Sequence, residues 1–200
     1  MDWSLFHSVN DFAQRTGWAH GFMRSYAKYG VSIFAVLLVI AGLMSLRRGA
    51  QALARTGWAA GAALVALVLN QPIANAVDRA RPYVSHPHVH LVISRSADPS
   101  FMSDHSVVAG AVAAGLCFVS WRLGLVAAVA AVFMAFARVY VGAHYPGDVL
   151  AGLAFGALIA TAGVTLADRL LAPIVQRALD TPIGRRIAAY ETPTSRTPRT

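Results

Sequence analysis

The sequence is poor in charge and in cysteine. Only 13% of its 200 residues are charged, whereas 56% are hydrophobic, and the mean hydropathy is +0.53. This composition supplies too little polar surface for an ordinary water-soluble globular domain. Cys117 is the single cysteine, which excludes a disulfide framework or a thiolate metal site within one chain. The composition therefore predicts an integral membrane protein.

The sequence shows neither a basic stripe nor the residue order of a secretory signal peptide. The net charge is +8, but the cations flank apolar segments and do not cluster with exposed aromatic residues, which argues against nucleic-acid binding. Asp2 and Asp11 precede Arg15, and the first long apolar run starts only near Val31. That order is not typical of a signal peptide, so no cleaved segment is expected.

Five apolar segments are long enough, or nearly so, to cross a bilayer as helices. A hydrocarbon core of about 30 Å takes about 20 helical residues. We predict spans over residues 29–46, 57–76, 106–121, 123–141 and 149–171. Residues 3–17 place apolar side chains on one face and predict an amphipathic helix in the interface. The expected fold class is all-α, a polytopic membrane helix bundle with about five transmembrane helices and an N-terminal interfacial helix.

A single bundle domain is predicted for residues 1–173, followed by a basic tail over residues 174–200. Ala and Gly are frequent in the spans and allow helix backbones to approach closely. We attribute the Gly152 and Gly156 pair to packing within the chain, and no oligomeric state is predicted. In the tail, Pro, Thr and Arg dominate, so it is expected to be largely disordered, with residues 174–189 able to form a basic helix on the membrane.

The arginines predict an orientation. With five spans, one side carries Arg47, Arg48, Arg55, Arg122, Arg169, Arg177, Arg185 and Arg186. The positive-inside rule makes that side, and the C-terminus, cytoplasmic. Arg79, Arg81, Arg95 and Arg138 fall on the outer side, against the rule. Binding of an anion explains them, and anchoring at lipid headgroups is the alternative.

The run ARVYVGAHYPGD carries three groups suited to phosphate chemistry, Arg138, His144 and Asp148. Pro146 and Gly147 break the chain, and Asp148 stands where it can cap the last span, so a phosphate there meets the positive end of a helix dipole. An imidazole oriented by the Asp148 carboxylate is a competent nucleophile. Taken alone, the run also fits a capped helix beside an interfacial histidine.

Two other segments on the same side add to this chemistry. FMSDHS places Ser103, Asp104 and His105 at the start of the third span. His105 can protonate a leaving oxygen and Ser103 can hold a nonbridging oxygen, although helix capping also explains these residues. In DRARPY, the Arg81 guanidinium can bind a phosphate through two hydrogen bonds. Arg79, two residues away, can contribute a second positive charge.

The run HPHVH contains three alternating histidines, His86, His88 and His90. Metal binding is one interpretation, but no cysteine or suitably spaced carboxylate accompanies them. We favour an exposed loop that touches the lipid headgroup. No cofactor is predicted.

RARP, SDH and RVYVGAHYPGD together resemble the three motifs of the type 2 phosphatidic acid phosphatase superfamily, over about residues 75–148. The superfamily pattern is Lys-x6-Arg-Pro, then Pro-Ser-Gly-His, then Ser-Arg-x5-His-x3-Asp. The resemblance implies a metal-independent lipid phosphatase in which His144 attacks phosphorus, Asp148 orients His144, and His105 protonates the leaving group. The residues it assigns to phosphate binding are Arg81, Arg138 and Ser103.

The chain departs from the superfamily pattern at four positions, Ala74, Met102, Asp104 and Ala137. Ala74 stands where the lysine is expected, so either Arg79 supplies the missing charge or the headgroup binds with a different geometry. We include Arg79 and Asp104 among the predicted phosphate-binding residues. The Ser-Asp-His motif and the opening LFHSVNDFA resemble the bacterial undecaprenyl pyrophosphate phosphatase branch.

The sequence thus predicts an enzyme that removes the terminal phosphate of a polyprenyl pyrophosphate through a phosphohistidine. The expected location is the inner (plasma) membrane of a bacterium, with the site on the periplasmic or extracellular side. The expected partners are the lipid phosphate and membrane lipids. Phosphatidylglycerophosphate or phosphatidic acid as substrate, phosphotransfer to another acceptor, and noncatalytic binding or transport of anionic lipids remain alternatives.

Overall fold

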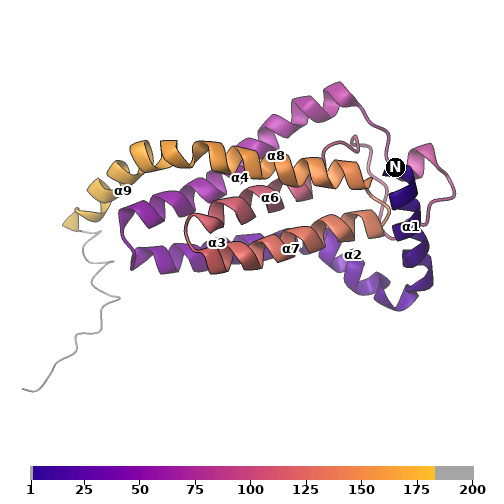
Figure 1. The fold of residues 1–200 in the computed structure, drawn as a ribbon, viewed down its shortest axis with the longest axis horizontal. Coiled ribbons are helices and arrows are strands. Elements are labelled where there is room, and N and C mark those ends of the chain that lie inside the picture. Colours follow the sequence, from indigo (N-terminus) through magenta and orange to yellow (C-terminus); the bar gives the residue numbers. More distant parts are fainter. Residues whose placement is uncertain (1, 183–200) are drawn as a thin grey trace, which may run out of the picture.

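The computed structural model describes residues 2–182, and this part of the chain is helical apart from its loops (Figure 1). The elements are α1 (Asp2–Arg15), a 3-10 turn (Gly17–Ala19), α2 (His20–Tyr29), α3 (Val31–Leu46), α4 (Ala50–Val77), α5 (Pro82–Ser85), α6 (Asp104–Cys117), α7 (Trp121–Tyr140), α8 (Pro146–Leu166), a π-helical turn (Ala167–Leu171) and α9 (Ala172–Leu179). The predicted class, an all-α membrane helix bundle, is confirmed.

Each predicted span corresponds to a helix, but the helices differ in length. Within residues 2–182, three stretches are long and apolar enough to cross a membrane, Ala50–Ser85, Trp121–Tyr140 and Pro146–Leu179. The segment Gly17–Tyr29 together with α3 makes a fourth, bent by 55° at its break. The α6 helix is apolar but has only 14 residues. The count of five spans therefore stays a prediction.

The α6 helix lies at the centre of the bundle, between α4, α7 and α8. Nine of its 14 residues are buried, and most of these are small. Glycines on α8 allow a very close approach, because a Cβ built on Gly156 would lie 2.0 Å from the Val107 carbonyl oxygen and one on Gly152 would lie 2.9 Å from the Ser103 carbonyl oxygen. The Gly152 and Gly156 pair therefore packs against α6 of the same chain.

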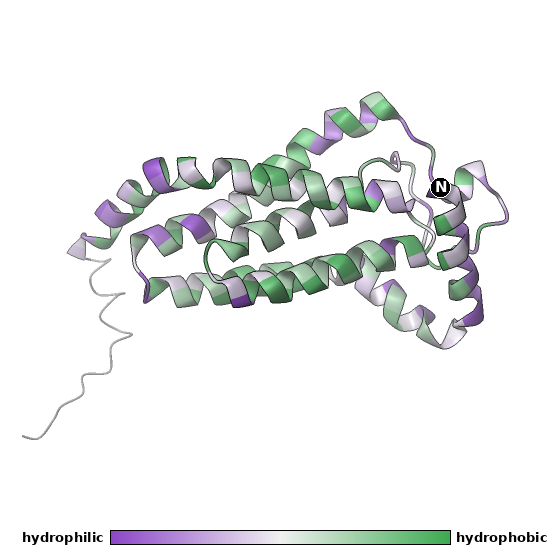
Figure 2. Cartoon of the chain, in the orientation of Figure 1, coloured by the Kyte–Doolittle hydropathy of each residue, from purple (hydrophilic) through white to green (hydrophobic). Residues whose placement is uncertain are grey.

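The two ends of the bundle carry different polar residues and different elements. Hydrophobic residues cover its length, and hydrophilic residues gather at the ends (Figure 2). At one end Arg48 donates to the Val119 carbonyl at 3.0 Å and Arg55 forms an ion pair with Asp168 at 2.7 Å. At the other end α1 lies across the bundle beside α2 and the long connection between α4 and α6 (Figure 1). This second end holds the predicted site.

The α2 helix is an element that the sequence analysis did not predict. Its Met23 and Ala27 are buried, and the Tyr26 hydroxyl donates to the Ala130 carbonyl of α7 at 3.0 Å. At the bend into α3, a Cβ on Gly30 would lie 2.5 Å from the Tyr26 carbonyl oxygen, so glycine permits the turn. The bend moves α2 out of the line of α3 and towards the site.

The helix predicted over residues 3–17 is present as α1, which buries Phe6, Asn10 and Ala13 and exposes apolar residues such as Leu5 and Phe12. Its location in the membrane interface stays a prediction. At the other terminus, the helix continues past the predicted boundary at 173 to Leu179. The predicted tail falls mainly on residues 183–200, which lie outside the described residues. The division at residue 173 stays a prediction.

Candidate active site

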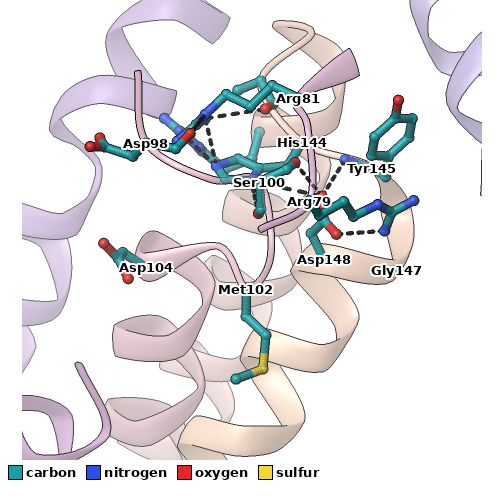
Figure 3. A network of polar contacts seen from close by, with 12 residues as sticks. Arg79, Arg81, Asp98, Ser100, Met102, Asp104, His144, Tyr145, Gly147 and Asp148 are labelled. Atoms are coloured by element: carbon teal, nitrogen blue, oxygen red, sulfur yellow. Dashed lines mark hydrogen bonds and ion pairs between the residues drawn. The ribbon is translucent and has the colours of Figure 1, made fainter. Parts of the chain in front are cut away.

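His144 lies in the short connection between α7 and α8 and is 2% exposed. Its Nδ1 is 2.7 Å from the Ser100 carbonyl oxygen, which can only accept, so Nδ1 carries the proton. Its Nε2 therefore accepts hydrogen bonds, from Nη2 of Arg138 at 3.0 Å and from Nη1 of Arg81 at 3.3 Å. Figure 3 shows the contact with Arg81. A neutral imidazole whose unprotonated nitrogen faces two guanidinium groups is suited to attack an anion that takes over their hydrogen bonds.

The two arginines are held in place by main-chain oxygens. Arg138, in the last turn of α7, donates to the Ala27 carbonyl of α2 at 3.1 Å, and its buried Nε has no partner among the described residues. Arg81, which precedes Pro82, donates to the Asp98 carbonyl at 2.7 Å. Within residues 2–182, neither guanidinium forms an ion pair with a carboxylate, so both charges remain available to an anion.

Burial lowers the pKa of His144 well below its ordinary value, and the positive charges of Arg138 and Arg81 lower it further. The hydrogen bond to the Ser100 carbonyl acts in the opposite sense and is the weaker influence. The imidazole is therefore neutral at physiological pH. A neutral imidazole is the form that a nucleophile requires.

Asp148 is completely buried and accepts three hydrogen bonds. The donors are the Ser100 hydroxyl, the Tyr145 amide at 3.0 Å and Arg79 Nη1 at 2.6 Å (Figure 3). Its nearer oxygen is 4.0 Å from Nδ1 of His144, too far for a hydrogen bond. The expected direct contact is absent because the carboxylate caps its own helix and pairs with Arg79.

Ser100 connects the two residues instead. Its carbonyl accepts the His144 Nδ1 proton, while its hydroxyl donates to Asp148. Sequence reasoning missed Ser100, which lies in an irregular segment outside the three motifs. Its proximity to SDH in the sequence was the available signal, but a serine in a loop is too common to stand out.

Arg79 is not brought to the predicted phosphate. Its guanidinium pairs with Asp2 and with Asp148 and stacks over the Tyr145 ring at 4.1 Å. The Asp2 carboxylate also accepts the Gly147 amide at 2.7 Å, at the start of α8. Arg79 therefore neutralises and positions carboxylates behind His144. Asp2 is a second residue that the sequence analysis missed, since nothing in its surroundings links it to the motifs.

The second motif lies at the N-terminus of α6. Ser103 is completely buried, and its hydroxyl has no partner among the described residues, so it has a hydrogen bond to offer. The Asp104 carboxylate accepts amide hydrogen bonds from Asn70 at 2.7 Å and Gln71 at 3.1 Å. Because a carboxylate repels a phosphate, this arrangement suits Asp104 to holding α6 against α4 rather than to anion binding.

A cavity of about 360 Å³ lies in front of the imidazole. Five predicted site residues line it together, and these are Arg81, Asp104, His105, Arg138 and His144. The predicted residues Arg79, Ser103 and Asp148 are not part of its lining. Ala74, at the position of the family lysine, also lines it and contributes no charge. The cavity presents a nucleophile, a second imidazole and two guanidinium groups to one ligand, and Asp98 and Asp104 also belong to its lining.

The three alternating histidines lie apart from this cavity. His86 stacks on Trp3 of α1, with ring centroids 3.6 Å apart, and His90 lies 5.0 Å from His20. Among residues 2–182, no group of three or more His, Cys, Asp or Glu side chains is arranged to hold a metal ion. The HPHVH run docks the loop onto α1 and α2.

A buried imidazole between arginines, at one end of an apolar helix bundle, defines a membrane enzyme that acts on an anionic group. Residues 55–171 match the PAP2 superfamily, and the chain belongs to that family. It is a membrane lipid phosphatase, as the motifs predicted.

Three relatives illustrate the range of the family. The chain is 27% identical over 175 residues to the undecaprenyl-diphosphatase BcrC of Bacillus subtilis, covering 88% of each chain. It is 39% identical over 127 residues to a lipid A 1-phosphatase of Rhizobium johnstonii, covering 58% of this chain and only 50% of that protein. The fold is similar to a PAP2 type phosphatidylglycerolphosphate phosphatase from Bacillus subtilis, with a TM-score of 0.60, 23% identity and coverage of 84% and 87%.

Proposed function

We propose that this lipid phosphatase removes the terminal phosphate of a polyprenyl diphosphate through a phosphohistidine on His144. The observation that carries the proposal is the state of the imidazole, with Nδ1 bound to the Ser100 carbonyl and Nε2 facing Arg138 and Arg81. An imidazole held in this tautomer presents the attacking lone pair to the place where two cations hold the phosphate.

In the first step, Nε2 of His144 forms a bond to the terminal phosphorus. The bond from that phosphorus to the bridging oxygen breaks, and its electron pair leaves with the lipid monophosphate. His105 lines the same cavity, and burial together with Arg138 lowers its pKa to about 4, so it is neutral in the free site. It takes up a proton when the anionic phosphate binds and donates that proton to the leaving oxygen. Arg138 and Arg81 transfer their hydrogen bonds from the imidazole to the nonbridging oxygens, where charge is concentrated in the transition state.

In the second step, His105 removes a proton from water as the water attacks the phosphohistidine. The bond between phosphorus and nitrogen breaks, inorganic phosphate leaves, and His144 regains its lone pair. The Ser103 hydroxyl, buried and without a partner among the described residues, is assigned to a nonbridging oxygen. Asp148 acts through Ser100 to hold the imidazole. These groups account for both steps without a metal or a cofactor.

We place the site at the outer face of the membrane and the C-terminus in the cytoplasm. The support is the concentration of arginines at the end of the bundle that is remote from His144, including Arg48 and Arg55. A diphosphate exposed at the outer surface is then reached from the water, while the lipid chain stays in the bilayer.

The diphosphate is favoured by the similarity to BcrC, which extends over most of both chains. A second candidate substrate is a glycolipid 1-phosphate, since the lipid A 1-phosphatase shares higher identity over a shorter region. Both candidates present a phosphate on a lipid anchor to the same four side chains. A substrate comparison separates them.

The test is phosphate release by the purified protein from a panel of undecaprenyl diphosphate, lipid A, phosphatidylglycerophosphate and phosphatidic acid, with and without a chelator. We expect the highest kcat/KM on the diphosphate, no effect of chelator, and loss of at least about a thousandfold in His144→Ala. Acid-quenched enzyme should carry a phosphate bound to nitrogen. Wild-type activity in His144→Ala would contradict the nucleophile, and chelator sensitivity would contradict the metal-free mechanism.

A further inference from the structure

A second and larger cavity adjoins the catalytic cavity. It has a volume of about 570 Å³, and its lining shares His105 and Arg138 with the cavity in front of His144. Its remaining charged side chains are Arg24 and Lys28 of α2. A ligand held at His144 can therefore extend past His105 towards α2.

The second cavity is strongly cationic. No acidic side chain belongs to its lining among residues 2–182, whereas Arg24, Lys28 and Arg138 all do. Arg24 and Lys28 are one helical turn apart, an arrangement in which like charges repel each other and destabilise the helix. Lys28 is also the only lysine of the whole sequence. An anion in the cavity would offset this repulsion.

Hydrogen bonds hold the α2 helix beside the catalytic cavity. The Ala27 carbonyl, directly before Lys28, accepts a hydrogen bond from Arg138 at 3.1 Å. Arg24 donates from Nε to the Val92 carbonyl at 2.7 Å, which leaves its two terminal nitrogens for a ligand. The Lys28 ammonium lies 5.0 Å from the centre of the Tyr29 ring, and this exposed residue lines the cavity.

We propose that Arg24 and Lys28 form a second phosphate subsite, which binds the lipid-linked phosphate of a diphosphate while His144 attacks the terminal phosphate. This inference rests on the proposed function and names its substrate class. When the bridging bond breaks, negative charge develops on the lipid-linked phosphate, so cations placed there stabilise the transition state more than the ground state. His105 lies at the junction of the two cavities, where the bridging oxygen takes its proton.

The subsite makes the enzyme selective for diphosphates over monophosphates, because a monophosphate lipid held at His144 has no group to offer Arg24 and Lys28. The first test compares kcat/KM for a polyprenyl diphosphate and for the monophosphate of the same lipid, with full-length purified protein. In Lys28→Ala we expect about a tenfold or greater loss on the diphosphate and less than about a twofold change on the monophosphate. Lys28→Arg should retain most of the activity on the diphosphate.

Arg15→Ala is the matched control, since Arg15 is an exposed cation at the same end of the molecule and lines neither cavity. It should leave both rates unchanged. An equal loss on both substrates in Lys28→Ala, or an equal effect of Arg15→Ala on the diphosphate, would overturn the subsite.

The single lysine allows a second test that does not depend on turnover. An amine-reactive reagent should label Lys28, and mass spectrometry of the peptide measures the extent. A methylene-bridged polyprenyl diphosphonate should protect Lys28, whereas the corresponding monophosphonate should not. Equal labelling with both analogues would refute the subsite even if the enzyme cleaves the diphosphate. Failure of the wild-type enzyme to cleave any diphosphate, with protection retained, would instead refute the proposed function alone.

Discussion

The Nδ1 proton of His144 is donated to the Ser100 carbonyl at 2.7 Å, and this bond decides which ring nitrogen can attack. Burial and the neighbouring guanidinium groups keep the ring neutral. The residue therefore stays in its nucleophilic form under conditions in which an exposed histidine, with a pKa of about 6.5, becomes protonated. Ser100 contributes through its main chain, so a side-chain motif does not reveal it.

We expect the imidazole of His144 to remain neutral as the pH falls through about 6.5, because its pKa is lowered by burial, Arg138 and Arg81. Nitrogen-15 NMR of histidine-labelled protein measures this titration, with the spectrum of His144→Ala used for assignment. Arg81→Gln removes one positive charge and should move the titration to higher pH. A wild-type midpoint at the ordinary value would contradict the electrostatic description of the site.

Motif spacing sufficed to bring His144, Arg138, Arg81 and His105 together, since each lies at the end of a helix and these ends meet. It did not suffice for Arg79, whose charge suggested a phosphate contact. The structure pairs Arg79 with the carboxylates of Asp148 and Asp2, and Asp2 lies near the N-terminus. A contact across 77 positions leaves no periodic trace in the sequence.

Among the elements, α6 and α8 make the most extensive contact, and they carry the second and third motifs. Glycine at the contact lets the α8 backbone approach Val107 so closely that Ser103 donates its amide to the Asp148 carbonyl at 3.3 Å. In lipid, the hydrophobic effect contributes little to helix association. Close packing at glycine and interhelical hydrogen bonds therefore stabilise the contact between α6 and α8. The geometry of the site therefore depends on small residues far from the chemistry.

We predict that Gly156→Ala lowers the free energy of unfolding by about 1–3 kcal/mol, because the added Cβ would overlap the Val107 carbonyl oxygen in a packed interface. Thermal unfolding in detergent measures the change. Gly42→Ala is the control, since no atom lies within 4 Å of a Cβ at Gly42. The control should match the wild type within about 1 kcal/mol. Equal stability of both variants would show that the α6 and α8 contact tolerates a methyl group.

The α1 helix also reaches the site, through Asp2, which pairs with Arg79 and caps α8 at Gly147. Asp2→Asn keeps an acceptor for the Gly147 amide but removes the charge that shares Arg79 with Asp148. We expect kcat to fall about two- to fivefold with little change in KM, the effect of a partly exposed ion pair that positions other groups. Asp2→Glu should restore part of the loss, and Asp11→Asn on the same helix should have none. A change confined to KM would contradict a positioning role.

At the scale of the whole molecule, the two polar ends of the bundle have different tasks. One end carries α1, α2 and the site, and the other carries arginines that bind main-chain oxygens and Asp168. If positive charge sets the orientation, the site faces outward. The enzyme then meets a lipid phosphate at the surface where its α1 helix exposes apolar side chains.

This orientation is tested by placing single cysteines in a Cys117→Ala background. His88→Cys, in the exposed loop beside α1, should react with an impermeant maleimide in intact cells with a permeabilised outer envelope. Arg122→Cys, exposed at the start of α7, should react only after the plasma membrane is disrupted. The reverse pattern of labelling would place the site on the cytoplasmic side and contradict the proposal.

The sequence by itself determined the membrane class, the helical fold and the residues of the three motifs, because hydrophobic length and fixed motif spacing are local properties. It did not determine the bend that forms α2 or the contacts of Ser100 and Asp2. These depend on which helices pack together and how closely, which is a property of the tertiary structure. The same packing carries Arg24 and Lys28, from a helix that has none of the motifs, to the edge of the catalytic cavity.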